Sequence, residues 1–449
     1  MATSRNETEL RWAWISWQNQ MSNLKKIFIE SVSLQNFGAR TNDYDNIGEC
    51  WREELEEPDL ENLVHNLYKN IEHLYNLLHA VVRYRLSEAY PEIVDPRKPI
   101  PSHLLGSMSS QNWESLIDLL LPKKNLPNIT TSMQRKNYTV QKMVKKAEDY
   151  YLSLGFPPMS KTFWENSIFE RRNEIMNCHA SAANMYLDDD FRILACLEVT
   201  ARDFQIIHHE LGHIQYFMAY KDQPTILRNA PNSAFHEAIG DAILHGVMTP
   251  QHLQRIGFID DYFLTDNLPI LLKQALSKLP QLPHSLIIDK WRWDVFSGKI
   301  KPSNYNRSWW KLFKNYMGIV PPIPRSEMYF DPAAVFHITE NVPYIRYFLS
   351  NILQVQLFES MCEAAVTGKI NNPNFNMSLH QCDIYGSKDA GRILRSLMKL
   401  GSSVHWKYAL YITTGSSNYK TGPLLRYYEP VRKWLQLQID HYNIPVGWN

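Results

Sequence analysis

The segment IIHHELGHIQYFMAY, residues 206–220, carries two histidines four positions apart, with a glutamate directly after the first. On an α-helix, residues i and i+4 lie on the same face, so His209 and His213 can offer ring nitrogens to one metal ion. Glu210, one position after His209, leans toward the same ion without binding it. Zinc in a hydrolase usually takes three protein ligands and keeps one position open for water, so the motif needs a third ligand.

The segment FHEAIGD, residues 235–241, contains a candidate for this third ligand. Glu237 and Asp241 share a helix face, so one carboxylate can bind a metal while the other orients a ligand histidine. The five-residue histidine motif also occurs by chance in helices without a metal, and the second acidic pair makes it more specific. We therefore predict a zinc site at which His209, His213 and one carboxylate of this pair bind the ion, while the other carboxylate orients a ligand histidine.

Two neighbouring histidines, His208 and His236, are interpreted as structural, because each has a better-placed neighbour for the metal. Long helices must hold both motifs, and the sequence predicts a mainly α-helical chain. Over residues 60–82, apolar residues at steps of three and four mark one face of a long helix. The same pattern recurs at residues 21–32, 346–366 and 392–399. Strand patterns are scarce, and only residues 177–182 and 191–200 are candidates for a small sheet.

Charge and hydropathy exclude several classes of protein. The 449 residues include 47 Lys and Arg against 46 Asp and Glu, which leaves a net charge of +1. This balance gives no electrostatic reason to expect a nucleic-acid partner. No segment has the roughly 18 consecutive apolar residues that a membrane helix needs. We predict a soluble, globular protein without a membrane segment.

Cysteines and glycosylation motifs point to an extracellular protein. Of the five cysteines, four fall into two local pairs, as extracellular disulfides often do, and Cys50 is left over. The N-terminus has no apolar run typical of a secretory signal, so we expect a secreted protein whose signal segment is missing from this sequence. The N-x-S/T motifs, which are candidate glycosylation sites, are at Asn6, Asn128, Asn137, Asn306 and Asn376.

Several motifs together resemble the catalytic domain of the angiotensin-converting enzyme family, a family of zinc peptidyl-dipeptidases. They are HHELGHIQYFMAYKDQP with FHEAIGDA, CHASA, KWRWDVFSGKI, VPYIRYF and CDIYGSKDAG. The similarity extends from Trp12 to Trp448. It implies a large, mainly α, two-lobed domain with a deep central cleft, zinc at its floor and a very small β-sheet. It also implies one peptidase domain over residues 1–449 that lacks the N-terminal lid helices of the family.

The resemblance also assigns catalytic roles. His209, His213 and Glu237 would bind zinc, which leaves Asp241 to orient a ligand histidine. Glu210 would be the general base, and His337 and Tyr347 would donate hydrogen bonds to the oxyanion of the tetrahedral intermediate. From spacing alone, Tyr344, Arg346 and Tyr347 indicate only an aromatic helix face with a solvated arginine.

Further residues are matched to binding roles through the same resemblance. His179 and Ala180 would lie along the peptide, while Gln111 and Tyr344 would bind its C-terminal carboxylate. Arg346 and Tyr44 would bind one chloride ion. The disulfides implied by the family pattern are Cys178–Cys196 and Cys362–Cys382.

Three departures from the family pattern bear on function. Val335 stands where a lysine would pair with the substrate carboxylate, so the Michaelis constant should rise by about ten-fold or more. Phe313 stands where a second chloride site would use arginine, so that site is predicted to be lost. Ala183 and Asn184 follow CHASA in place of Trp-Asp, which alters the wall of the non-primed side.

The motifs favour a zinc metallopeptidase that removes C-terminal dipeptides from oligopeptides with a free C-terminus. Within the enzyme class, a monocarboxypeptidase is an alternative, since it would suit the loss of the lysine, although Gln111 is a dipeptidase-type residue. A secreted, non-catalytic or weakly active homologue that binds peptides or partners is an alternative from another class. The altered carboxylate pocket favours that last alternative, and the intact zinc motif opposes it.

Overall fold

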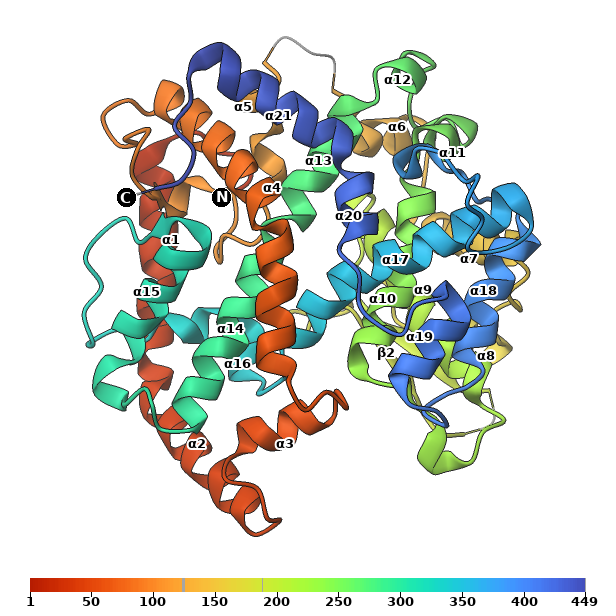
Figure 1. Ribbon diagram of the computed structural model, residues 1–449, viewed down its shortest axis with the longest axis horizontal. Helices are drawn as coiled ribbons and strands as arrows, with labels where there is room; N and C mark the ends of the chain where they lie inside the picture. Colours follow the sequence, from red (N-terminus) through yellow and green to blue (C-terminus); the bar gives the residue numbers. More distant parts are fainter. Residues whose placement is uncertain (123–125, 188, 449) are drawn as a thin grey trace. The chain divides into compact units, whose positions relative to one another are not determined.

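The computed structural model of the chain describes residues 1–122, 126–187 and 189–448. Helices make up most of it (Figure 1), which confirms the predicted mainly α fold. The chain divides into two compact units that are each assembled from separate stretches. Unit 1 comprises Met1–Asn125, Leu268–Leu349 and Tyr428–Asn449, and unit 2 comprises Leu126–Asn267 and Ser350–Tyr427. Each unit is described by itself.

Unit 1 is built around the long helix α4, whose apolar stripe is buried along its length. Helices α14 and α21 pack against α4, and α15 packs against α14. Aromatic side chains fill this core, where Trp291 contacts the rings of Phe28, Tyr305 and Trp309. The helices of unit 1 are α1 Glu7–Met21, α2 Lys25–Arg40, α3 Ile47–Glu53, α4 Leu60–Ala89, α5 Ile117–Leu120, α13 Leu268–Lys278, α14 Gln281–Phe296, α15 Tyr305–Met317, α16 Phe336–Thr339, the start of α17 Ile345–Thr367, and α21 Glu429–Tyr442.

Unit 2 is built around α9 and α10, which lie against each other, with α7 and α18 packed on α9. The rest of α17 also belongs to this unit. The further helices of unit 2 are α6 Ile129–Arg135, α7 Val140–Ser153, α8 Lys161–Asn166, α9 Ala201–Tyr220, α10 Ser233–Val247, α11 Pro250–Arg255, α12 Tyr262–Thr265, α18 Lys388–Met398, α19 Trp406–Thr414 and α20 Gly422–Tyr427.

Three of the four helices predicted from apolar periodicity are confirmed, as α4, α17 and α18. The prediction over residues 21–32 is confirmed only from Lys25, where α2 begins, because Met21 ends α1 and Ser22–Leu24 form a 3-10 helix between them. The predicted strands are confirmed only in part. In unit 2, β2 Ser181–Asn184 pairs antiparallel with β3 Phe191–Leu194. The expectation of a strand from residue 177 is wrong for residues 177–180, because there the amide of His179 bonds to the Asn177 side chain instead of a neighbouring strand.

Strand β3 also ends earlier than expected, since the amides of Ala195 and Leu197 pair with the carbonyls of Ile168 and Phe169. In unit 1, the sequence pattern gave no sign of a short parallel pair, β1 Ile100–Pro101 with β4 Ile319–Val320. With two residues each, β1 and β4 are too short to show the alternation that marks a strand in a sequence.

Both disulfides implied by the resemblance are present in unit 2. Cys178 is bonded to Cys196, and Cys362 is bonded to Cys382. Cys50 is a free thiol. Among the helices of the described residues, none combines the length and apolar character that crossing a membrane requires.

The candidate glycosylation sites differ in exposure. Asn6, Asn128, Asn137 and Asn376 are exposed. The prediction for Asn306 is wrong, because this side chain is 0% exposed and its amide nitrogen donates to Ser326 O and to the Asp331 carboxylate. A sugar on that nitrogen would leave the buried acceptors of Ser326 and Asp331 with one partner fewer.

Candidate metal centre

Helix α9 presents the first histidine motif because its two faces differ in character. The helix starts at an N-cap, Thr200, whose hydroxyl accepts the amide of Asp203 at 3.1 Å. Ile207, Leu211 and Ile214 are buried completely on the packing side. The face that carries His209 and His213 is thereby held in a fixed orientation.

Helix α10 brings the second acidic motif to the same place. Its packing on α9 requires glycine at two positions, since a Cβ on Gly212 would lie 2.5 Å from Gly240 Cα. A Cβ on Gly240 would lie 2.5 Å from the His209 carbonyl oxygen. Real Cβ atoms cannot approach so closely, so these glycines let the two helix backbones meet where the histidines and Glu237 stand.

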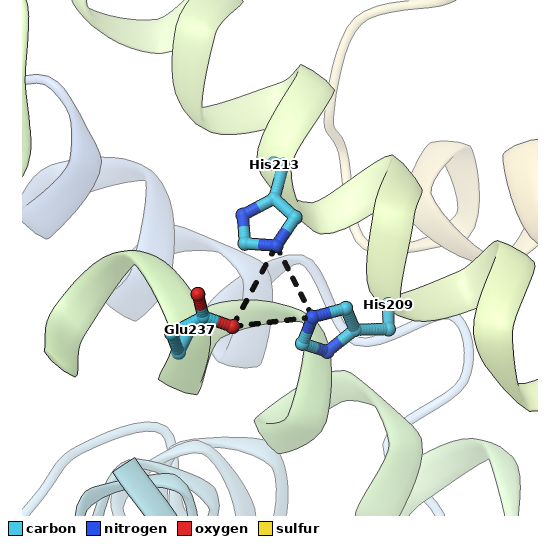
Figure 2. Close-up of side chains that lie close together, drawn as sticks. All are labelled: His209, His213 and Glu237. Carbon is cyan, nitrogen blue, oxygen red and sulfur yellow. Dashed lines mark hydrogen bonds and ion pairs between the residues drawn. The ribbon is translucent and has the colours of Figure 1, made fainter. Parts of the chain in front are cut away.

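The three predicted ligands converge on one point (Figure 2), with their ligand atoms all within 4.8 Å of one another. His209 Nε2 lies 3.1 Å from His213 Nε2 and 3.5 Å from Glu237 Oε2, and His213 Nε2 lies 3.9 Å from the same oxygen. In a tetrahedral zinc site with bonds of about 2.0–2.2 Å, ligand atoms are separated by about 3.4 Å. The donor set and its spacing therefore fit a zinc ion.

Asp241 contacts His209 in the way that the spacing predicted for one carboxylate of the acidic pair. Its Oδ1 lies 3.0 Å from His209 Nδ1, so this nitrogen carries the proton and Nε2 is left with a lone pair for a metal. Burial lowers the pKa of His209, but the carboxylates of Asp241, Glu237 and Glu210 raise it well above its usual value. The same burial, with His209 and His236 nearby, lowers the pKa of His213 to about 4.

Glu210 lies next to the triad without being part of it. It is 7% exposed, and its charge acts on both His209 and His213. A buried carboxylate beside a metal site is placed to accept a proton from a water molecule there.

The residues proposed to stabilise the oxyanion form a second cluster, in unit 1. His337 Nε2 and the Tyr347 hydroxyl are 3.0 Å apart. The ring of Tyr344 packs against both, at 4.7 Å between ring centres in each case. Tyr347 lies in the first turn of α17, whereas Tyr344 precedes the helix.

A buried ion pair that sequence reasoning missed holds this cluster in place. Asp289 Oδ2 accepts the amides of Tyr344 and Ile345 at 2.7 and 2.6 Å, while Oδ1 accepts Arg292 Nε at 2.8 Å. Arg292 also donates to the His337 carbonyl at 3.3 Å. The sequence holds one sign of this ion pair, because Asp289 directly follows the apolar run LII on α14. An aspartate in such a run is rarely buried without partners.

The residues matched to substrate binding are placed as follows. In unit 1, Gln111 Oε1 accepts a hydrogen bond from Ser109. Val335 is 6% exposed and lines a small cavity of about 20 Å³ together with Ser109 and Phe313. In unit 2, His179 and Ala180 precede β2, so they lie outside the strand that was expected over residues 177–182. Their role along a peptide stays a prediction.

The chloride predictions stay predictions as well. Tyr44 donates to the Glu53 carboxylate, and within the described part of unit 1 no direct hydrogen bond joins Tyr44 to Arg346. An anion between them would not need such a bond. Phe313 packs against the rings of Trp309, Trp310 and His284. Its own side chain offers no positive charge to an anion.

Comparison with known proteins places the whole chain in one family. A family model described as angiotensin-converting enzyme, Peptidase M2, matches residues 1–448. Angiotensin-converting enzyme of Bos taurus is 40% identical over 456 residues, which cover 100% of this chain and 34% of that protein. Angiotensin-converting enzyme-like protein Ace3 of Mus musculus is also 40% identical, with 100% of this chain and 61% of that protein covered.

An angiotensin-converting enzyme-related protein of Drosophila melanogaster is 37% identical over 455 residues, covering 100% of this chain and 72% of the fly protein. The chain spans 34% of the length of the bovine enzyme. With the match extending over nearly all of its residues, the chain belongs to the Peptidase M2 family of angiotensin-converting enzymes.

Proposed function

We propose that the protein is a zinc metallopeptidase that removes dipeptides from the C-terminus of oligopeptides. The observation that carries this proposal is the convergence of His209, His213 and Glu237 at zinc-like spacing, with the carboxylate of Glu210 beside them. Membership of a peptidase family supports it.

His209, His213 and Glu237 would hold the zinc ion. When bound, zinc lowers the pKa of water and polarises a carbonyl group as a Lewis acid. Glu210 accepts a proton from the attacking water at a carboxylate oxygen, and then donates it to the nitrogen of the leaving amine. Asp241 keeps the proton of His209 on Nδ1 throughout, because it accepts that N–H.

His337 and Tyr347 are proposed to donate hydrogen bonds to the negative oxygen that forms at the scissile carbonyl. Asp289 and Arg292 hold the segment that carries both donors, so the donors lose little freedom when the charge appears. Gln111 and Tyr344 are proposed to bind the terminal carboxylate of the substrate. These roles come from the family resemblance.

The proposed release of dipeptides and not of single residues rests on the same resemblance, because Gln111 is a dipeptidase-type residue. We also propose that the protein acts outside the cell, which the two disulfides and the four exposed glycosylation motifs favour. Chloride bound by Arg346 and Tyr44 would be a further ion of the enzyme.

A second function is favoured by one specific observation. Val335 provides no charge for a substrate carboxylate, which suits a weakly active homologue that binds peptides through the same residues. Turnover measurements separate this function from the first.

The test uses the full chain, purified after expression with added zinc. Elemental analysis should give one zinc per chain, and a blocked tripeptide with a free C-terminus should be cleaved to release its last two residues. A chelator should abolish cleavage, and added zinc should restore it. Zinc bound without any cleavage would favour the binding homologue, whereas release of one residue at a time would favour a monocarboxypeptidase.

A further inference from the structure

The two histidines of the metal triad are supported by different partners. The outer nitrogen of His209 meets the carboxylate of Asp241, as described above. The outer nitrogen of His213 points away from the triad (Figure 2) and lies 2.6 Å from Nδ1 of His236. An imidazole therefore stands behind one ligand where a carboxylate stands behind the other.

The chemistry of the two rings fixes which one donates. His213 must keep a lone pair on Nε2, because that nitrogen faces His209 and Glu237 in the triad. Its proton is then on Nδ1 and is donated outward. His236 must accept this proton with a lone pair on Nδ1, so its own proton stands on Nε2.

Helix packing holds the ring of His236 in the orientation that this acceptor role needs. The ring stacks on Tyr216, with 4.8 Å between centres and 29° between planes, and also contacts Phe217 at 5.0 Å. Tyr216 and Phe217 come from α9, the helix that carries His213, whereas His236 precedes Glu237 on α10. The contact thus joins both ligand helices directly behind the metal position.

We propose that His236 is a positioning residue for the metal centre, which accepts the Nδ1 proton of His213 and so holds Nε2 of that ligand toward the ion. The inference rests on the zinc site of the proposed function. A neutral imidazole acceptor cannot transfer as much negative charge to its ligand as Asp241 does, so the two ligand histidines are supported unequally.

A pair of substitutions separates the acceptor from the ring. In His236→Phe the ring that stacks on Tyr216 remains but the acceptor is lost. In His236→Asn the ring is lost, but the amide oxygen can occupy the position of Nδ1 and accept the same proton. His441→Phe, an exposed site in unit 1, is the control for a histidine-to-phenylalanine change.

The measurement is the dissociation constant for Zn²⁺ alone, from competition with a chromophoric chelator, on the full chain. We expect His236→Phe to raise it about 10- to 100-fold, as removal of partners behind zinc ligands usually does, while His236→Asn and His441→Phe stay close to the parent protein. Equal weakening by Phe and Asn, or no weakening by either, overturns the inference. Thermal unfolding of the zinc-free proteins identifies any variant that fails to fold.

A second measurement needs no substitution. In the zinc-loaded parent protein labelled with ¹⁵N at histidine, NMR should show His213 protonated at Nδ1 and His236 protonated only at Nε2. A proton on Nδ1 of His236 overturns the inference. If zinc binding depends on His236 as expected but no peptide is cleaved, the proposed function fails and the positioning role stands.

Discussion

The metal triad of unit 2 and the His337–Tyr347 cluster of unit 1 both consist of polar side chains held in place, but different structures hold them. The triad stands on two regular helices, and residues on these same helices orient its ligands. In unit 1, His337 lies in a helix of one turn and Tyr344 lies in a non-helical segment before α17. A buried ion pair on another helix, α14, holds that segment.

This difference shows where each cluster is vulnerable. Substitution of a ligand or of Glu210 should change chemistry while α9 and α10 remain packed through Gly212 and Gly240. In unit 1, removal of one buried charge should disturb several backbone hydrogen bonds together. Variants that separate chemical from structural effects therefore test this difference between the two clusters.

The largest effect is expected for Glu210→Gln. The amide cannot accept a proton from water, so kcat should fall by about 10²- to 10⁴-fold, the usual contribution of a general base. Zinc content should stay at the parent value, because Glu210 is not in the triad. Steady-state kinetics and elemental analysis measure the two quantities.

Glu198→Gln is the matched control, since Glu198 is exposed in the same unit and lies outside α9. Its kcat should not change. A near-parent rate for Glu210→Gln would show that another group is the base.

The contrast between the clusters also explains what could be predicted from the sequence. Spacing was enough to group His209 with His213 and Glu237 with Asp241, because a helix converts steps of four into shared faces. Which of the two carboxylates binds the metal followed only from the resemblance. The mainly helical fold followed from the same periodicity.

The unit 1 cluster could not be identified in that way. His337 and Tyr347 contact each other from positions that do not share a helix, and Asp289, far away in the sequence, accepts the amides of Tyr344 and Ile345 beside them. Spacing alone indicated only a solvated helix face there, and the resemblance was needed to suggest a role. His236 was interpreted as structural because its neighbour Glu237 is the better-placed ligand, and sequence does not show which ring faces which.

The next largest effect is expected for Asp289→Ala. This change leaves the Arg292 charge buried without its partner and removes the acceptor for two amides. Breaking a buried pair typically costs about 3–5 kcal/mol of the free energy of unfolding. Denaturant unfolding measures the loss, and zinc binding by the folded fraction should be unaffected.

Asp294→Ala on the same helix is the control. Asp294 is partly exposed, and its ion pair with the exposed Lys299 is long, at 3.6 Å. It should cost less than about 1 kcal/mol. Equal effects of the two variants would mean that the buried pair is not what holds the unit 1 cluster.

A somewhat smaller effect is expected for Tyr347→Phe. The ring can stay packed on Tyr344, but the donor to the developing oxyanion is lost. Loss of one such donor typically lowers kcat by about 10²- to 10³-fold, and KM should change little. Kinetics on a free-acid tripeptide provide both constants, and a change confined to KM would argue that Tyr347 binds substrate in its ground state instead.

The smallest effect is expected for Val335→Lys, which tests whether the terminal carboxylate of a substrate is bound in unit 1. Val335 borders a cavity of about 20 Å³, which has room for roughly one water molecule. The cavity is too small for a lysine side chain, so the ammonium group must extend toward water. A free C-terminal carboxylate near Gln111 would then gain a charge-assisted hydrogen bond.

Such a bond contributes about 1.5–3 kcal/mol, so KM for free-acid peptides should fall by about ten-fold or more. The reacting groups at the scissile bond are unchanged, so kcat should change less. Amidated peptides are the control, because they lack the carboxylate and should keep their KM. Equal changes in KM for both kinds of peptide, or none for either, would mean that residue 335 does not face the carboxylate and that the alignment with the family pattern fails at this position.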